Sequence, residues 1–200
     1  NDTATTEIYT RTVANADARN IGYNTLTGDI IENWMNGNQP EERADREYQA
    51  AHDIMSLLND AGVPNGVLPG NHDNFWGRDN TKFNDYFPVS MYQDAPWYGE
   101  AWAPGDNAAH TDYFSAGGVD FLVISLPYRP TDEQIDWAAQ QAASHPDHSV
   151  VLATHYYLHT SGVRDSVDLR HTGNADVMWE EVVAPNDNVF LVLGGHYHGV

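Results

Sequence analysis

Two histidines, two residues apart, follow the last apolar run of this 200-residue chain. The run Val189–Leu193 is followed by Gly-Gly-His-Tyr-His, which places imidazoles at His196 and His198. Side chains in an extended segment alternate faces with a period of two, so these two rings would point the same way. Neutral imidazole is a common ligand for Zn, Fe, Ni and Cu. This turn therefore predicts half of a metal site.

Three other short apolar runs also end in side chains that could serve such a site. These residues are Asp29, Asn71, His72, Asp73 and His155. In open α/β sheets, sites form outside the carboxyl ends of the strands, where residues far apart in the sequence meet. We therefore expect these side chains to lie close to the histidine pair.

The four motifs, in this order, resemble those of the calcineurin-like metallophosphoesterases. The family pattern is Asp-x-His or Asp-x-Gln, then Gly-Asp, then Gly-Asn-His-Asp or Gly-Asn-His-Glu, then a lone His, then Gly-His-x-His. The chain carries the last four motifs, at residues 28–29, 70–73, 155 and 195–198. The resemblance implies a layered α/β sandwich with mixed central β-sheets flanked by helices, and a metal site at the carboxyl ends of strands.

The resemblance also implies two divalent metal ions, which could be Mn, Zn, Fe or Mg. Asp29 would bridge the two ions. Asn71, His155 and His196 would complete the shell of the second ion. His198 would belong to the first ion. Two such ions hold the phosphoryl oxygens and share a hydroxide that attacks phosphorus, so the implied reaction is hydrolysis of a phosphate mono- or diester.

Two residues of the Gly-Asn-His-Asp motif carry catalytic roles by resemblance. His72 would face the phosphate, stabilising the transition state or protonating the leaving oxygen, and Asp73 would orient its imidazole. Purple acid phosphatases have a tyrosine three residues after the aspartate of Gly-Asp, whereas this chain has Glu32 there. We therefore expect no tyrosinate–iron chromophore.

The first family motif is missing, because no apolar strand precedes Asn1. Asp2 is either a remnant of an Asp-Thr-Gln motif or only a terminal residue. In both cases the first ion keeps mainly Asp29 and His198, so its site would be weak or empty. Because the chain also ends directly after the last motif, we expect a phosphoesterase domain that is incomplete at both ends.

Two other classes of function compete with the enzyme hypothesis. A non-catalytic metal-binding or surface module could retain the fold and lose the chemistry, as the missing first motif would allow. A structural calcium-binding protein would carry Asp-x-Asp-x-Asp-Gly loops. The sequence contains no such loop, which disfavours this alternative.

Helical and strand-like patterns alternate along the chain, as is typical of an α/β layer fold. Apolar residues at helical spacing predict a helix within 40–60, a capping box at 131–134 begins a second, and a third covers about 175–183. A further strand is expected over Val119–Leu126. Residues 74–117 show little periodicity, so we predict an irregular excursion that forms one wall of the cleft within a single domain, 1–200.

The charge balance limits the partners. The chain has 29 acidic and 9 basic residues, a formal charge of −20, and Lys82 is its one lysine. Such a surface repels polyanions, which disfavours duplex nucleic acid, although divalent cations would still let a small phosphate ester bind.

There is no apolar run long enough for a membrane span. The absence of cysteine favours an extracellular or periplasmic location, with the cytoplasm of a salt-adapted cell as the alternative. Six other histidines are assigned to surface or core positions: His52, His110, His145, His148, His159 and His171.

Overall fold

The computed structural model describes residues 2–32, 34, 41–164 and 174–197. Its helices are α1 (Asp2–Arg19), α2 (Glu41–Asp60), α3 (Thr81–Tyr86), α4 (Val89–Tyr92), α5 (Asp132–Ser144) and α6 (Ala175–Met178), which continues as a π-helical turn over Trp179–Val183. Its strands are β1 (Asn24–Leu26), β2 (Asn65–Val67), β3 (Tyr98–Ala103), β4 (Asp106–Ala116), β5 (Val119–Leu126), β6 (Ser149–Thr154) and β7 (Val189–Leu193).

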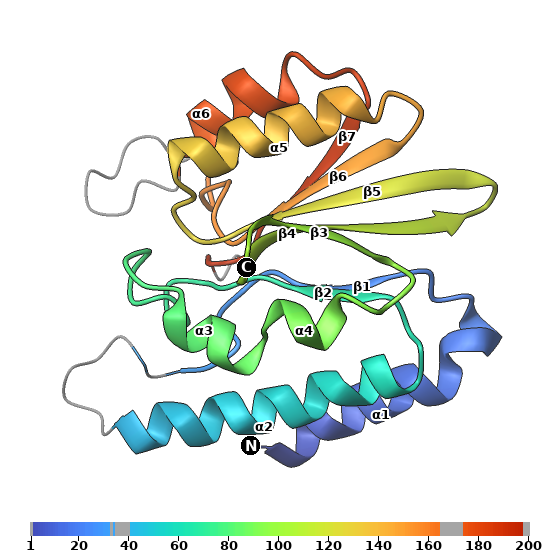
Figure 1. Cartoon of the computed structure of the whole chain (residues 1–200), viewed down its shortest axis with the longest axis vertical. Coiled ribbons are helices and arrows are strands. Elements are labelled where there is room, and N and C mark those ends of the chain that lie inside the picture. Colours follow the sequence, from blue (N-terminus) through green and yellow to red (C-terminus); the bar gives the residue numbers. More distant parts are fainter. Residues whose placement is uncertain (1, 33, 35–40, 165–173, 198–200) are drawn as a thin grey trace.

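These elements stack in layers (Figure 1). Helices α5 and α6 cover one face of the sheet of β3 to β7, the pair β1–β2 lies on the other side of that sheet, and α1 and α2 form the outermost layer beyond it. The five-stranded sheet has the order β3-β4-β5-β6-β7; β3 to β5 pair antiparallel, and β5 to β7 pair parallel. Strands β1 and β2 pair parallel. The predicted α/β fold of mixed sheets flanked by helices is confirmed.

An apolar cluster fills each space between layers. Ile135 of α5 packs with Leu152 of the five-stranded sheet, and Leu68 packs with Val123 between the two sheets. The third cluster includes Met55 and other inward residues of α2. Strands β1 and β2 run parallel to each other, as do β6 and β7, so each pair presents its carboxyl ends at one edge of its sheet.

The helices begin and end close to the predicted positions. Helix α2 buries Ala44, Tyr48, Met55 and Leu58, as their spacing predicts. Helix α5 begins with the predicted capping box: the Thr131 side chain accepts a hydrogen bond from the Gln134 amide, and the Gln134 side chain accepts one from the Thr131 amide.

The prediction of an irregular excursion over 74–117 is wrong for much of that range. It contains α3, α4 and the antiparallel pair β3–β4. Strand β4 is buried along most of its length, and its buried residues include the polar His110, Thr111 and Asp112. A strand buried on both faces shows no polar–apolar alternation, and its buried polar residues also hide the apolar run.

Helix α1 was not expected from the sequence. It packs against α2 through partly buried Tyr9, Val13 and Ala16, which lie at helical spacing. Asp2 is the first residue of this helix. Among the described residues, no helix is both long and apolar enough to cross a membrane.

Candidate metal centre

Four strand ends bring the predicted metal ligands together. Asp29 follows β1 and Asn71 follows β2, both after short turns. His155 comes directly after β6, and His196 lies three residues beyond the end of β7. Asp29, His155 and His196 offer ligand atoms that all lie within 4.8 Å of one another.

The closest contacts join three atoms from three segments. His155 Nε2 lies 3.0 Å from Asn71 Oδ1 and 3.1 Å from His196 Nδ1, and these last two atoms lie 2.8 Å apart. The Asp29 Oδ1 atom is 3.4 Å from the same His155 nitrogen. Zn–N bonds are about 2.0–2.1 Å long, so neighbouring ligand atoms around such an ion lie roughly 3 Å apart. The spacing therefore suits a divalent cation.

The main chain fixes the tautomer of His155. Its Nδ1 atom lies 2.6 Å from the Thr27 carbonyl oxygen, which can only accept, so Nδ1 carries the proton. The other nitrogen, Nε2, then presents a lone pair toward the Asn71 oxygen and the Asp29 carboxylate. A cation among these electron-pair donors would turn their mutual repulsion into attraction, as in other sites where a carbonyl holds the second nitrogen of a ligating imidazole. The donor set therefore fits a metal ion.

The surroundings of Asp29 favour the ionised form of its carboxyl group. Burial raises the pKa of its carboxyl group, but the positive charge that His155 and His72 carry when their rings are protonated, together with the His72 amide, outweighs this effect, so the pKa lies below its usual value. The His72 amide donates a hydrogen bond of 3.2 Å to Asp29 Oδ1. Asp29 has a left-handed φ of 53°, a strained conformation that is typical of functional sites.

Two glycines permit the close approach of the turns after β1 and β2. A Cβ atom added to Gly28, whose φ is 92°, would lie 2.5 Å from the Gly70 nitrogen and 2.6 Å from His155 Nδ1. A Cβ atom added to Gly70 would clash with the backbone and side chain of Asp29. Only glycine at both positions lets Asp29 and Asn71 reach the same centre.

A family model described as calcineurin-like phosphoesterase matches residues 10–200. The chain belongs to the calcineurin-like phosphoesterase family. It is also 35% identical over 182 residues to YvnB of Bacillus subtilis (strain 168), which is described as an uncharacterized protein. That match covers 90% of this chain but 13% of the length of YvnB. Members of this family are described as phosphoesterases.

The Asp73 carboxylate does not contact the His72 ring, contrary to the orienting role that the resemblance implied for it. This buried carboxylate accepts hydrogen bonds from the amides of Ile30, Ile31 and Gly70, at 3.1, 2.9 and 2.7 Å. The Nδ1 atom of His72 lies 2.6 Å from the carbonyl oxygen of Glu32 instead. Asp73 therefore ties the turn after Asp29 to the turn before Asn71.

Burial also changes the ionisation of Asp73. It raises the pKa of this carboxyl group to about 6, although the three amide bonds oppose the shift. The carboxylate is thus ionised at neutral pH and can accept all three bonds.

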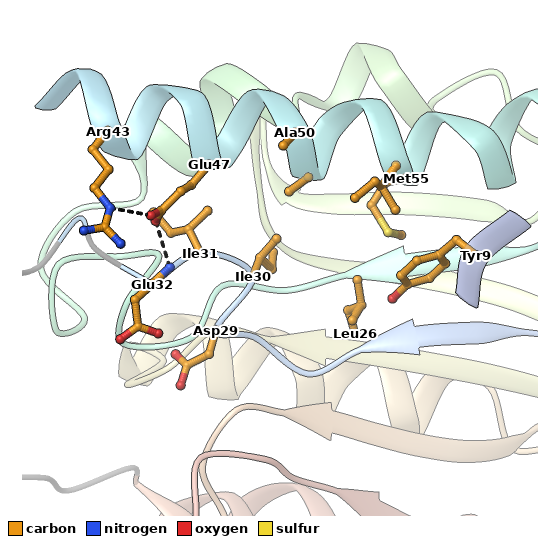
Figure 2. A pocket seen from close by; sticks show the side chains of 12 residues that line it. Tyr9, Leu26, Asp29, Ile30, Ile31, Glu32, Arg43, Glu47, Ala50 and Met55 are labelled. Atoms are coloured by element: carbon orange, nitrogen blue, oxygen red, sulfur yellow. Dashed lines mark hydrogen bonds and ion pairs between the residues drawn. The ribbon is translucent and has the colours of Figure 1, made fainter. Parts of the chain in front are cut away.

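A cavity of about 490 Å³ lies between α2 and the segment after β1. Its walls are largely apolar and include Ile31, Ile54 and Met55. Figure 2 shows Asp29 at its edge with the carboxylate directed away from α2. The cavity therefore adjoins the metal centre at Asp29.

The other described histidines lie away from the metal centre. His198, the expected ligand of the first ion, and His171 lie outside the described residues. Among the described histidines, His110 pairs with Asp112 in the interior, and His159 Nδ1 lies 3.0 Å from Ser161 Oγ. Within the described ranges, the cluster of acidic and histidine ligands contains neither of them.

Sequence reasoning did not identify Tyr128. Its buried ring lies 5.7 Å, centroid to centroid, from both the His155 and His196 rings. The residue follows the end of β5 by two positions, so the rule that placed the other site residues after strand ends could have found it. Its contacts indicate that it packs the two imidazoles in place.

Proposed function

We propose that this chain hydrolyses phosphate mono- or diesters with bound divalent cations. The observation that carries the proposal is the convergence of Asn71 Oδ1, His155 Nε2 and His196 Nδ1 within 3.1 Å of one another, beside the Asp29 carboxylate. These donors come from four strand ends and include no thiolate, a set suited to Mn, Fe, Zn or Mg.

The metal ligands have distinct proposed tasks. Asn71, His155 and His196 would hold one ion, and Asp29 would bridge it to a second ion that also binds His198. Divalent ions supply the charge that stabilises the phosphoryl oxygens and the acidity that turns a coordinated water into a nucleophile. Thr27, through its carbonyl, keeps the lone pair of His155 Nε2 directed at the centre.

His72 is the proposed residue for the phosphate side of the reaction. Its amide donates to the Asp29 carboxylate and its Nδ1 atom contacts the Glu32 carbonyl oxygen, so its Nε2 atom is the nitrogen that remains for substrate. In the protonated ring Nε2–H would donate to the phosphate or to the leaving oxygen. We further propose that residues 1–200 act as one domain.

The test measures metal content and turnover on the same samples. The purified chain should retain Mn²⁺ after gel filtration and hydrolyse bis(p-nitrophenyl) phosphate or p-nitrophenyl phosphate. Asn71→Ala and His196→Ala should reduce both metal content and rate. His145→Ala is the matched control, because this histidine contacts Tyr113 away from the centre.

The outcomes separate the enzyme from its alternative. Retained metal without turnover on either ester would support a non-catalytic metal-binding module. Turnover that Asn71→Ala leaves unchanged would come from a contaminant and would contradict the proposal.

A further inference from the structure

The orientation and the tautomer of the His72 imidazole depend on the main-chain carbonyl of Glu32. A carbonyl oxygen can only accept, so the 2.6 Å contact between His72 Nδ1 and Glu32 O requires the proton on Nδ1. The neutral ring then carries its lone pair on Nε2. The ring orientation and the tautomer are therefore as well defined as the position of this carbonyl.

Two carboxylates hold the segment that carries this carbonyl. Asp73 accepts from the amides of Ile30 and Ile31, as described above. The next amide, that of Glu32, donates a 3.0 Å hydrogen bond to Glu47 Oε2. Three successive amides are thus bound by side chains from outside the segment.

Glu47 is itself oriented on helix α2. Its other oxygen, Oε1, accepts a 2.8 Å hydrogen bond from Arg43 Nε, one turn earlier, and the Glu47 side chain is 25% exposed. Figure 2 shows the chain of contacts from Arg43 through Glu47 to the Glu32 nitrogen. A charged, paired acceptor that is partly shielded from water binds an amide more strongly than a neutral one.

Tyr48, the residue after Glu47, connects helix α2 to Asp73, the residue after His72. The hydroxyl of Tyr48, whose side chain is buried, donates to the carbonyl oxygen of Asp73. Helix α2 therefore holds residue 32 through Glu47 and residue 73 through Tyr48. These contacts flank His72 without touching its ring.

We propose that Glu47, oriented by Arg43, is a positioning residue that sets the orientation and tautomer of His72 through the backbone of Glu32. The catalytic consequence of this proposal rests on the proposed phosphoesterase function. Because Glu47 contacts none of the four clustered metal donors by the hydrogen bonds above, its removal should act on His72 and leave metal binding intact.

The experiment compares Glu47→Ala with Glu47→Gln. The glutamine keeps an oxygen that can accept from the Glu32 amide, whereas alanine removes it. Asp53→Ala is the matched control, since it removes an exposed carboxylate from the same helix where it contacts Gln49.

Nitrogen-15 NMR of the imidazole reports the tautomer directly. In the Mn-free wild type, the His72 ring, assigned by its loss in His72→Ala, should show the proton on Nδ1. Glu47→Ala should shift the ring toward a mixture of tautomers, while Glu47→Gln and Asp53→Ala keep the wild-type pattern.

Kinetics with Mn²⁺ provide the second readout. We expect Glu47→Ala to lower kcat by about 10- to 100-fold with KM nearly unchanged, because misplacing a reacting group costs about this much. The Mn content should stay at the wild-type level, and Glu47→Gln should recover most of the rate.

An unchanged His72 spectrum in Glu47→Ala would overturn the proposal, and so would a loss of metal content that parallels the loss of rate. If the wild type shows no turnover, the proposed function fails, and the NMR comparison alone decides whether Glu47 positions His72.

Discussion

The Oδ1 atom of Asn71 and the Nδ1 atom of His196 lie 2.8 Å apart, although 125 residues separate them in the chain. Asn71 follows a strand of the two-stranded sheet, and His196 follows the edge strand of the five-stranded sheet. The candidate metal centre therefore joins the two sheets. Binding a cation there should stabilise the whole fold as well as support chemistry.

Metal binding should raise the free energy of unfolding. A ligand present at 100 times its Kd stabilises the native state by about 2.7 kcal/mol. We expect Mn²⁺ to produce a stabilisation of this order in the wild type and none in Asn71→Ala, and EDTA to reverse it. Urea unfolding with and without Mn²⁺ measures both effects. An equal Mn²⁺ response in Asn71→Ala would place the bound ion elsewhere.

Replacing His72 should affect turnover and spare the metal. General acid–base groups contribute about 10²- to 10⁴-fold to rate, so His72→Ala should lower kcat within this range. Metal analysis should give the wild-type content, because the His72 side chain is not among the clustered ligands. His52→Ala, whose ring contacts the Tyr86 carbonyl, is the control that should keep the wild-type rate. A full loss of metal in His72→Ala would show that its role is structural.

The buried Asp73 should make stability depend on pH. Its pKa is raised from 3.8 to about 6 in the folded chain, so between these values the folded chain keeps a proton that the unfolded chain has released. The contribution of Asp73 to the free energy of unfolding is therefore largest below about pH 4 and falls as the pH rises to about 6, by about 3 kcal/mol for a two-unit shift.

Urea unfolding of the EDTA-treated protein at pH 4.5 and 6.5 measures this dependence. Asp73→Asn lacks the titrating group, so its stability should fall less over this interval than that of the wild type. Asn should also lower stability at both pH values, because its amide nitrogen cannot accept from the backbone amides. Equal pH slopes in the two proteins would mean that Asp73 titrates normally.

Adding a methyl group at Gly28 should separate the two metal-binding turns. Gly28→Ala combines a left-handed φ with a clash against Gly70, so we expect a loss of about 2–3 kcal/mol and of Mn²⁺ binding. Gly105→Ala is matched in backbone conformation, with φ of 78°, but has open space around the added atom. Thermal unfolding and metal content should show a smaller stability loss and normal Mn²⁺ binding in the Gly105 variant. Equal losses in both variants would assign the effect to backbone strain alone.

The sequence anticipated the residues at strand ends because a short apolar run followed by polar ligands is a local pattern. Asp29, Asn71, His155 and His196 lie together as this pattern predicts. Helices α2 and α5 were also predictable, because the apolar spacing of α2 and the capping box of α5 each involve residues that are close together in the sequence. The β3–β4 pair was not predictable, because the polar groups buried in β4 are stabilised by partners far along the chain, such as Tyr23 for Asp112.

The sequence by itself determined the family, the α/β class and the set of metal-competent side chains, because these depend on residue types and short spacings. The tertiary structure decided how the side chains are oriented. In the folded chain the Asp73 carboxylate accepts hydrogen bonds from the amides of residues 30, 31 and 70, and the His72 ring contacts the Glu32 carbonyl oxygen. A buried carboxylate binds the donors that the folded backbone brings within reach. Two of the three donors to Asp73, the amides of Ile30 and Ile31, lie 43 and 42 residues away in the sequence, so no local sequence pattern could predict the pairing.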